Sequence, residues 1–347
     1  MIQKIFSNPD IYQIDIPLPD NPLKNLNCYV IQDKEETLII DTGFNRPECM
    51  EAMKNGLAEL GVQWEKTSFF LSHLHSDHVG LVYALTKDKP CPIYMSRVDY
   101  HYLGDSLKGD SWLQLEEHYE KQGMPAQYTQ VLRTTNPARS FAPSGYFDAT
   151  TLEDGDTITV GRHTFTCILV EGHTPGQMCL YYAPEQILFT ADHILFDITP
   201  NITSWMEMED ALGDYLKSLK KIRQYPIKLA LPSHRKNDMD VYQRIDEIVH
   251  HHNIRLKEVL QALAQKPNSN AYETAAMLRW SMRGKSWEEF PLPQRWFALG
   301  ETMSHLDYLI KRGFVKQHKG DIYQYQLSHP LEEAFVILDK IWEQEQQ

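Results

Sequence analysis

The stretch Ser72-His73-Leu74-His75-Ser76-Asp77-His78 follows directly after the apolar run Ser68–Leu71, which reads as a buried β-strand. Four side chains that can bind metal ions lie within these few residues. In an extended segment, residues two positions apart point the same way, so His73 and His75 can share one cation. Asp77 and His78 follow after the chain turns and can face a second cation. The spacing therefore predicts two adjacent metal sites built from one loop.

Further metal-capable side chains follow apolar strands later in the chain. His173 comes shortly after one such run, Asp192 after a second and His234 after a third. Asp41 follows the run Leu38–Ile40 in the same way. Imidazole and carboxylate ligands suit Zn²⁺, and iron or manganese is compatible with the same donors. An isolated histidine is usually a surface or core residue, but this repeated placement at strand ends favours metal binding.

The ordered set of an HxHxDH motif, a later His, a later Asp and a final His resembles the metallo-β-lactamase superfamily over about Tyr12–Arg235. The resemblance implies an α/β fold, a four-layer αββα sandwich with the metals at one edge. It also implies two divalent metal ions, most simply Zn²⁺. By that pattern the first metal is held by His73, His75 and His173, the second by Asp77, His78 and His234, with Asp192 bridging them and Asp41 as a supporting residue behind the ligands.

The chain departs from the antibiotic-degrading branch of that superfamily, which usually has Cys as one ligand of the second metal. Asp192 stands here instead, so β-lactamase activity is not predicted. The pattern is closer to glyoxalase II-like thioesterases and related lactonases. Ala191-Asp192 replaces the common Gly-Asp, and His234-Arg235 replaces the common His-Gly. Both departures leave the ligands intact and affect the surrounding pocket.

The implied chemistry is metal-assisted hydrolysis of a small molecule. A water that bridges two cations has its pKa lowered toward neutrality, so hydroxide is available near neutral pH. We expect this hydroxide to attack an ester, thioester or lactone carbonyl. Asp77 and His78 are the predicted catalytic residues. Besides binding metal, Asp77 could also move a proton. Replacing His73 or Asp192 should abolish turnover.

The substrate pocket is the least determined part of the sequence. Residues 96–147 read as a helical insertion, and an insertion of this size often shapes a pocket. Tyr100 and His101 in this insertion are candidate substrate contacts, although aromatic residues at such spacing are more often core. His193, beside Asp192, is a third candidate, and a packing role is at least as plausible for it.

Two domains are predicted from the length of 347 residues. Residues 1–238 form the metallo-β-lactamase-like catalytic domain, and residues 239–347 form a long linking helix and a small winged-helix-like domain. The strands predicted for the catalytic domain are Tyr12–Pro17, Cys28–Gln32, Thr37–Asp41, Ser68–Ser72, Pro92–Met95, Thr157–Val160, His163–Val170, Met178–Tyr182, Ile187–Thr190 and Lys228–Pro232. A hairpin is predicted over Phe314–Gln326, after three helices at Ala271–Arg279, Pro293–Gly300 and Glu301–Arg312. This order of elements resembles the winged-helix domain appended to some of these hydrolases. That resemblance implies a role in packing, pocket closure or association.

The composition and charge indicate which kinds of partner and which cellular compartment are expected. The formal net charge of −13 disfavours nucleic acid, since phosphate would be repelled over most of the surface. No apolar run is long enough to cross a membrane, and no signal peptide is legible at the N-terminus. Five cysteines without a CxxC pair argue against a disulfide framework, which favours the cytoplasm. A homodimer is expected from family habit alone.

Three other functions stay open. The same two-metal site could clamp a phosphate in a phosphodiesterase or endoribonuclease, although the acidic charge argues against this. A mononuclear iron dioxygenase of the persulfide-oxidising kind uses a subset of these ligands. A non-catalytic or redox partner module is disfavoured, because the ligand set is complete.

Overall fold

The computed structural model describes residues 2–34, 36–89, 91–282 and 284–346. The chain divides into two compact units. The first comprises residues 1–109, 137–200 and 225–241, and the second comprises residues 110–136, 201–224 and 242–347. The predicted boundary at 238/239 lies close to the last change of unit, while two segments from earlier in the chain also belong to the second unit. Residues 1 and 347, the outer limits of the predicted domains, lie outside the described residues.

Within the described residues, the first unit contains a seven-stranded sheet with the order β1-β2-β3-β4-β5-β6-β7. Neighbours from β1 to β4 are antiparallel, and neighbours from β4 to β7 are parallel. The alternation of β-branched and aromatic residues predicted the central strands but not β1 and β7, which are short or edge elements. The strands are β1 Ile2–Phe6, β2 Asp10–Pro17, β3 Asn25–Asp33, β4 Glu36–Ile40, β5 Thr67–Leu71, β6 Ile93–Ser96 and β7 Thr150–Leu152.

A five-stranded sheet, with the order β12-β11-β10-β9-β8, is also described in this unit. Its strands are antiparallel except for the parallel pair β11 and β12. It follows that β9, β11 and β12 run in one direction and end at one edge of the sheet. The strands are β8 Thr157–Val160, β9 His163–Leu169, β10 Met178–Tyr182, β11 Ile187–Ala191 and β12 Leu229–Pro232.

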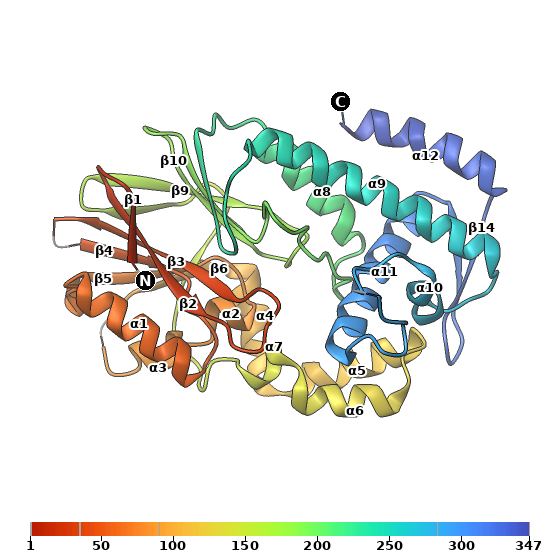
Figure 1. Ribbon diagram of the computed structural model, residues 1–347, viewed down its shortest axis with the longest axis horizontal. Helices are drawn as coiled ribbons and strands as arrows, with labels where there is room; N and C mark the ends of the chain where they lie inside the picture. Colours follow the sequence, from red (N-terminus) through yellow and green to blue (C-terminus); the bar gives the residue numbers. More distant parts are fainter. Residues whose placement is uncertain (1, 35, 90, 283, 347) are drawn as a thin grey trace. The chain divides into compact units, whose positions relative to one another are not determined.

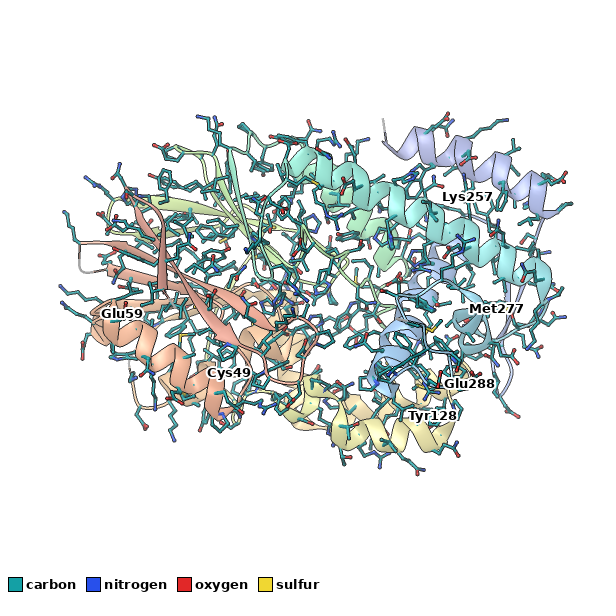
Figure 2. All side chains as sticks on the ribbon, in the orientation of Figure 1. Cys49, Glu59, Tyr128, Lys257, Met277 and Glu288 are labelled. Atoms are coloured by element: carbon teal, nitrogen blue, oxygen red, sulfur yellow. The ribbon has the colours of Figure 1, made fainter. Side chains whose placement is uncertain are left out.

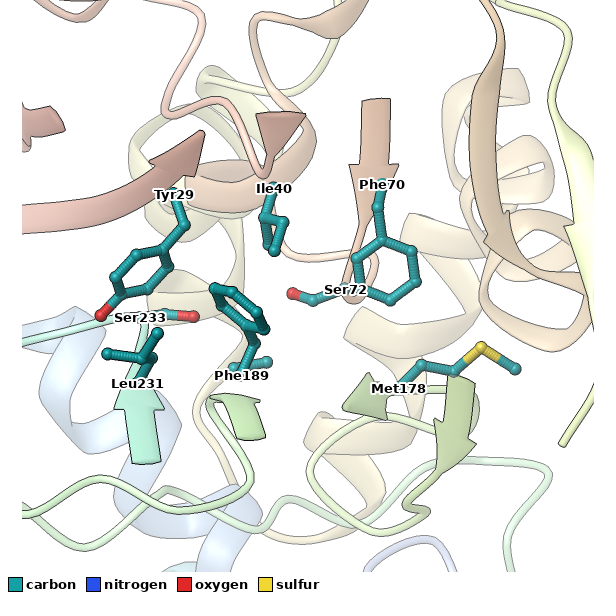
Figure 3. Close-up of a pocket in the computed structure, with 9 residues that line it drawn as sticks. Tyr29, Ile40, Phe70, Ser72, Met178, Phe189, Leu231 and Ser233 are labelled. Atoms are coloured by element: carbon teal, nitrogen blue, oxygen red, sulfur yellow. The ribbon is translucent and has the colours of Figure 1, made fainter. Parts of the chain in front are cut away.

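The two sheets pack face to face through a shared apolar core. Alternate residues of each strand point into this core, as expected for half-buried strands. A cavity of about 10 Å³ remains between the sheets, so the interior is closely filled. Figure 3 shows side chains from both sheets around this cavity: Tyr29, Ile40 and Phe70 from β3, β4 and β5, and Met178, Phe189 and Leu231 from β10, β11 and β12.

Helix α1, Pro47–Glu59, covers the outer face of the seven-stranded sheet (Figure 1). Pro47 occupies the first helical position, where its missing N–H costs nothing. The buried side chains of Cys49, Met53 and Leu57 recur at helical spacing and pack against this sheet. Cys49 and Glu59 mark the two ends of the helix in Figure 2. The other helices of the unit are η1 Trp64–Lys66, α2 Ser76–Val79, α3 Val82–Thr86, α4 Arg97–Lys108 and α7 Pro137–Ser140.

The second unit is mainly helical, with a two-stranded hairpin. The predicted helices Pro293–Gly300 and Glu301–Arg312 are wrong as separate elements: they form one helix, α11, because Gly300 lies inside a continuous buried stretch. No helix among the described residues is long and apolar enough to span a membrane. The elements are α5 Asp110–Lys121, α6 Ala126–Thr135, α8 Ala211–Ile222, α9 Val241–Gln265, α10 Ala271–Met277, α11 Leu292–Lys311, β13 Val315–His318, β14 Gln324–Leu327 and α12 Leu331–Gln346.

Two buried histidines connect α9 and α11. The carbonyl of Glu301 can only accept, so His305 Nδ1 donates to it over 2.7 Å, and His305 Nε2 accepts from His252 Nδ1 over 3.1 Å. Tyr215 packs on His252, and Arg255 on α9 is the cation beside them. Burial lowers the pKa of His305 to about 4 and that of His252 well below its usual value.

This pair should make the second unit sensitive to acid. Both folded-state pKa values lie below the unfolded value, so the stabilisation is complete above about pH 6.5 and is lost as the pH falls toward 4. We expect each of the two histidines to lower the free energy of unfolding by about 2 kcal/mol between about pH 7 and pH 5. His252→Asn, whose amide can replace the Nδ1 donor without titrating, should remove about half of this dependence. Urea unfolding followed by tryptophan fluorescence measures it, and an unchanged pH slope in the variant would contradict the assignment.

Candidate metal centre

The HxHxDH stretch forms the connection from β5 to α2. His73 lies in the extended segment after the strand, and His75 is the N-cap residue of α2 with extended backbone angles. Asp77 and His78 lie in the first turn of that helix and are buried. The chain therefore turns between the two pairs of side chains, at the position where the spacing predicted a turn.

The remaining candidate ligands come from the second sheet. His173 lies in the loop between β9 and β10, Asp192 follows β11 directly, and His234 lies two residues after β12. Because β9, β11 and β12 run in the same direction, all three residues lie at one edge of that sheet. The structure brings them to the HxHxDH loop of the first sheet.

Three overlapping groups of side chains could each hold a metal ion, and within each group the ligand atoms lie within 4.8 Å of one another. In the first group, His75 Nδ1 lies 3.1 Å from His73 Nε2 and 3.1 Å from His173 Nε2. The second group shares His73 with the first and His78 with the third, so the groups form one continuous cluster. They are His73, His75 and His173; His73, His78 and Asp192; and Asp77, His78 and His234.

Asp192 lies in the middle of this cluster. Its Oδ1 is 3.6 Å from His78 Nε2 and 3.4 Å from His234 Nε2, and its Oδ2 is 3.7 Å from His173 Nε2. Asp77 Oδ2 is 3.4 Å from His234 Nε2. One carboxylate thus reaches ligands from both ends of the cluster, as a bridging position requires.

Several ligand atoms are buried without a hydrogen bond among the described residues. These are His78 Nε2, His234 Nε2 and Asp192 Oδ1. A buried polar atom left unpaired costs about 1–3 kcal/mol, so three that converge on one point need a common partner. A divalent cation can be bound by all three atoms at once, and the donor set of imidazole and carboxylate suits zinc, iron or manganese. The residues present therefore fit a metal ion.

The charges of the cluster lead to the same conclusion. Burial lowers the pKa of His75 to about 3 and that of His73 well below its usual value, which keeps both imidazoles neutral. Burial alone would raise the pKa of Asp77, but His78 and His234 outweigh it and lower that pKa to about 2. In turn, Asp192 and Asp77 overcome the effect of burial and raise the pKa of His234 to about 10. The ionised carboxylates need positive charge, which protons or a bound cation can supply.

Asp41, the predicted supporting residue, contacts the metal loop directly. Its Oδ2 accepts from His78 Nδ1 and from Ser72 Oγ, each over 2.8 Å, and its Oδ1 accepts from the Ser72 N–H over 2.8 Å. With Nδ1 held in this way, His78 directs Nε2 into the cluster. Asp41 has a positive φ of 62°, an uncommon backbone angle that tends to occur at functional sites.

The two departures from the common motif also occur at left-handed backbone positions. Ala191 has φ 48° and Arg235 has φ 64°. Glycine adopts these angles without strain, which is a physical reason for glycine to be common at both places. In this chain the Arg235 guanidinium donates to the carbonyl of Pro22, and its own carbonyl accepts from Asn27 Nδ2 over 2.8 Å. These contacts hold the strained turn beside His234.

The three pocket candidates lie outside the ligand cluster. His193 is fully buried, with no exposed surface for a substrate. The Tyr100 hydroxyl donates to the carbonyl of Phe147 and is also hydrogen-bonded to the Tyr146 hydroxyl. His101 has a side chain that is 75% exposed and lies 3.4 Å from Asp105. Their proposed contact with substrate stays a prediction.

Two supporting residues were missed in the sequence. Ser72 gives Asp41 two hydrogen bonds, and Asp99 on α4 is a fully buried carboxylate close to the metal loop. Burial raises the pKa of Asp99 to about 7. An Asp three residues after Ser96 is the usual sequence of a helix N-terminus, so local sequence favours a purely structural role. Only the tertiary structure shows that the Asp99 carboxylate also contacts the metal loop, through the Leu74 N–H.

The family model that describes the metallo-beta-lactamase superfamily matches residues 22–234 of the chain. The chain belongs to this superfamily. Members bind divalent metal ions, which agrees with the cluster of buried His and Asp ligands. The predicted sandwich fold with a helical C-terminal region is confirmed. The matched range includes every candidate ligand of the superfamily pattern.

Several relatives are informative. The chain is 23% identical over 220 residues to the acyl-coenzyme A thioesterase MBLAC2 of Homo sapiens, covering 60% of this chain and 72% of that protein. It is 24% identical over 268 residues to the atrochrysone carboxyl ACP thioesterase of Aspergillus fumigatus, covering 74% and 69%. The crystal structure of a metallo-beta-lactamase family protein from Thermus thermophilus aligns with a TM-score of 0.76 and 26% identity, covering 91% of this chain and 98% of that one.

Proposed function

We propose that this superfamily member is a metal-dependent hydrolase that cleaves a thioester or a related ester or lactone bond of a small molecule. The observation that carries the proposal is the continuous cluster of seven side chains, joined through Asp192, at the meeting edges of two sheets. The preference for a thioester is supported by the two thioesterases among the relatives. A glyoxalase II-like activity is one form of this chemistry.

We infer that the cluster holds two divalent metal ions, with zinc favoured. His73, His75 and His173 would hold one ion, Asp77, His78 and His234 the other, and Asp192 both. Bound there, the metals would supply Lewis acidity toward the carbonyl group and lower the pKa of a coordinated water. The chain itself supplies imidazoles, of which those of His73 and His75 are held neutral by burial, and fixed carboxylates.

The substrate would enter from the side of His75 and Asp77. His75 is partly exposed, and the Asp77 side chain is 12% exposed, whereas His78 and His234 have no exposed side-chain surface. The cavity behind the ligands is too small for a substrate, since about 10 Å³ holds at most one water. Asp77 is therefore the carboxylate best placed to accept a proton from the reacting group.

Metal analysis and a substrate panel test the proposal. Protein purified without added metal should contain close to two metal ions per chain, and it should hydrolyse a small thioester or a lactone. Chelation should abolish turnover, and adding back Zn²⁺, Mn²⁺ or Fe²⁺ one at a time identifies the productive metal. Bis-nitrophenyl phosphate is the comparison substrate.

Each other outcome identifies a competing function. Two metals with turnover of the phosphodiester alone would indicate a phosphodiesterase or endoribonuclease. One iron with oxygen uptake and no hydrolysis would indicate a persulfide dioxygenase. No bound metal and no turnover would indicate a non-catalytic module.

The finer predictions for the rest of the protein stay proposals. Helices α10 and α11 followed by the hairpin β13–β14 support a winged-helix-like fold for the second unit. The part of the chain that the structure describes has no disulfide bond between any of Cys28, Cys49, Cys91, Cys167 and Cys179, which supports a reducing compartment such as the cytoplasm. A homodimer can be tested by light scattering.

A further inference from the structure

Asp99 is a buried carboxylate that lies outside the metal-ligand cluster. It lies in the first turn of α4, and its N–H donates to Ser96 Oγ over 3.1 Å as part of the helix cap. It belongs to none of the potential ligand groups found among the described residues. No Lys, Arg or His of the described chain forms an ion pair with it. A buried carboxylate in such a place is expensive unless hydrogen bonds compensate for the lost water.

Three hydrogen bonds from two different loops meet at this carboxylate. Asp99 Oδ2 accepts from the Leu74 N–H over 2.9 Å and from Thr174 Oγ1 over 2.7 Å. Asp99 Oδ1 accepts from the Gly176 N–H over 2.6 Å. Because all three partners donate, they favour the ionised form of the carboxylate, and hydrogen bonds to an ionised acceptor are about twice as strong as neutral ones.

These contacts lie beside the ligands of the first group. Leu74 is the residue between His73 and His75, and Thr174 directly follows His173. Asp99 thus connects the loop after β5 of one sheet with the loop after β9 of the other. Both loops that provide the three histidines are tied to one side chain.

The backbone at Gly176 shows how closely the second loop approaches α4. A Cβ atom at this position would lie 2.6 Å from the Asp99 backbone nitrogen and 2.5 Å from Ser96 Oγ. The side chain of any other residue would push the loop away from the helix. The close approach is therefore built into both partners.

We propose that Asp99 is a positioning residue that sets the distance between the His73/His75 loop and the His173 loop, and so preorganises the first metal site. The inference rests on the metal-binding part of the proposed function and not on the identity of the substrate. Without the hydrogen bonds that Asp99 accepts, metal binding would have to order two independent loops, and this entropic cost would reduce the metal affinity. Residues that hold metal ligands in place typically contribute about 10- to 100-fold in affinity.

The test measures metal affinity directly, by competition for Zn²⁺ with a chromophoric chelator. Asp99→Asn keeps the shape but offers only one oxygen, and its amide N–H groups face other donors. We expect Zn²⁺ binding at the first metal site, that of His73, His75 and His173, to weaken by about 10- to 100-fold. Asp105→Asn is the matched control: Asp105 is a half-exposed carboxylate on the same helix, paired with Lys108, and its loss should leave affinity unchanged.

A second pair of variants separates positioning from simple stability. Thr174→Val removes one of the three hydrogen bonds to the Asp99 carboxylate and should weaken Zn²⁺ binding. Thr174→Ser keeps the hydroxyl and should bind Zn²⁺ as the wild type does.

A merely structural role predicts a lower melting temperature for metal-free Asp99→Asn with unchanged Zn²⁺ affinity, and this result would overturn the proposal. Wild-type protein that binds no Zn²⁺ would overturn it as well. Wild-type protein that binds Zn²⁺ but hydrolyses nothing would contradict the proposed hydrolase. The positioning role of Asp99 would then still be decided by comparing the Zn²⁺ affinities of the wild type and the variants. The Thr174 pair decides the question if Asp99→Asn does not fold.

Discussion

Asp192→Asn should abolish hydrolysis while leaving the fold intact. The carboxylate lies within 3.7 Å of ligand nitrogens on His78, His173 and His234, so it reaches both ends of the cluster. Replacing it by a neutral amide removes a negative charge from the place where two cations would repel each other. We expect kcat/KM to fall by at least about 10³-fold, since metal catalysis contributes several kcal/mol. Metal content per chain should fall in the same samples.

Activity and metal content are measured against a variant in the same loop. Asp197→Asn removes an exposed carboxylate five residues later and should keep both values at the wild-type level. Circular dichroism of both variants checks the fold. Full turnover by Asp192→Asn with an unchanged metal content would refute the bridging role and, with it, the two-metal hydrolase.

Asp41→Ala should cause the largest loss of stability among these variants. It leaves His78 Nδ1, the Ser72 N–H and Ser72 Oγ buried without their shared acceptor. Breaking a fully buried polar interaction of this kind costs about 3–5 kcal/mol. Because the imidazole of His78 then loses its fixed orientation, metal affinity should also fall by about 10- to 100-fold.

Chemical denaturation of the metal-free protein gives the stability change without the contribution of bound metal. Asp10→Asn is the control, because Asp10 in β2 of the same sheet pairs with Lys4 at a half-exposed position. A surface pair of that kind is worth less than about 1 kcal/mol. An Asp41→Ala protein as stable as this control would show that Ser72 and His78 find other partners.

The local sequence was enough to predict the candidate ligands, because each follows a short apolar run. Strand ends after such runs lie at a sheet edge, and strands that run in one direction end at the same edge. His73, His173, Asp192 and His234 could therefore be selected without coordinates. The strands from β2 to β6 and from β8 to β12 were predicted within a few residues for the same reason, since period-two patterns are strong in half-buried strands.

The division into units was not readable from the sequence. Residues 110–136 and 201–224 belong to the second unit although the segments beside them in the chain lie in the first. Local patterns show that a segment is an amphipathic helix, but they do not show which core its apolar face joins. The single helix α11 was split in the prediction because Gly300 reads locally as a helix end, whereas its tight packing against Thr203 requires glycine there.

The sequence by itself determined the chemistry of the candidate ligands, the order in which the strands present them and, through the resemblance to the superfamily, the αββα class of the fold. Only the tertiary structure decided which atoms face one another. Asp99 is 25 residues from Leu74 and 77 residues from Gly176, and it joins them because α4 packs against both loops. Such a contact depends on the packing of two sheets and a helix. No spacing rule along a single segment can predict it, since hydrogen bonds between distant residues follow from the fold as a whole.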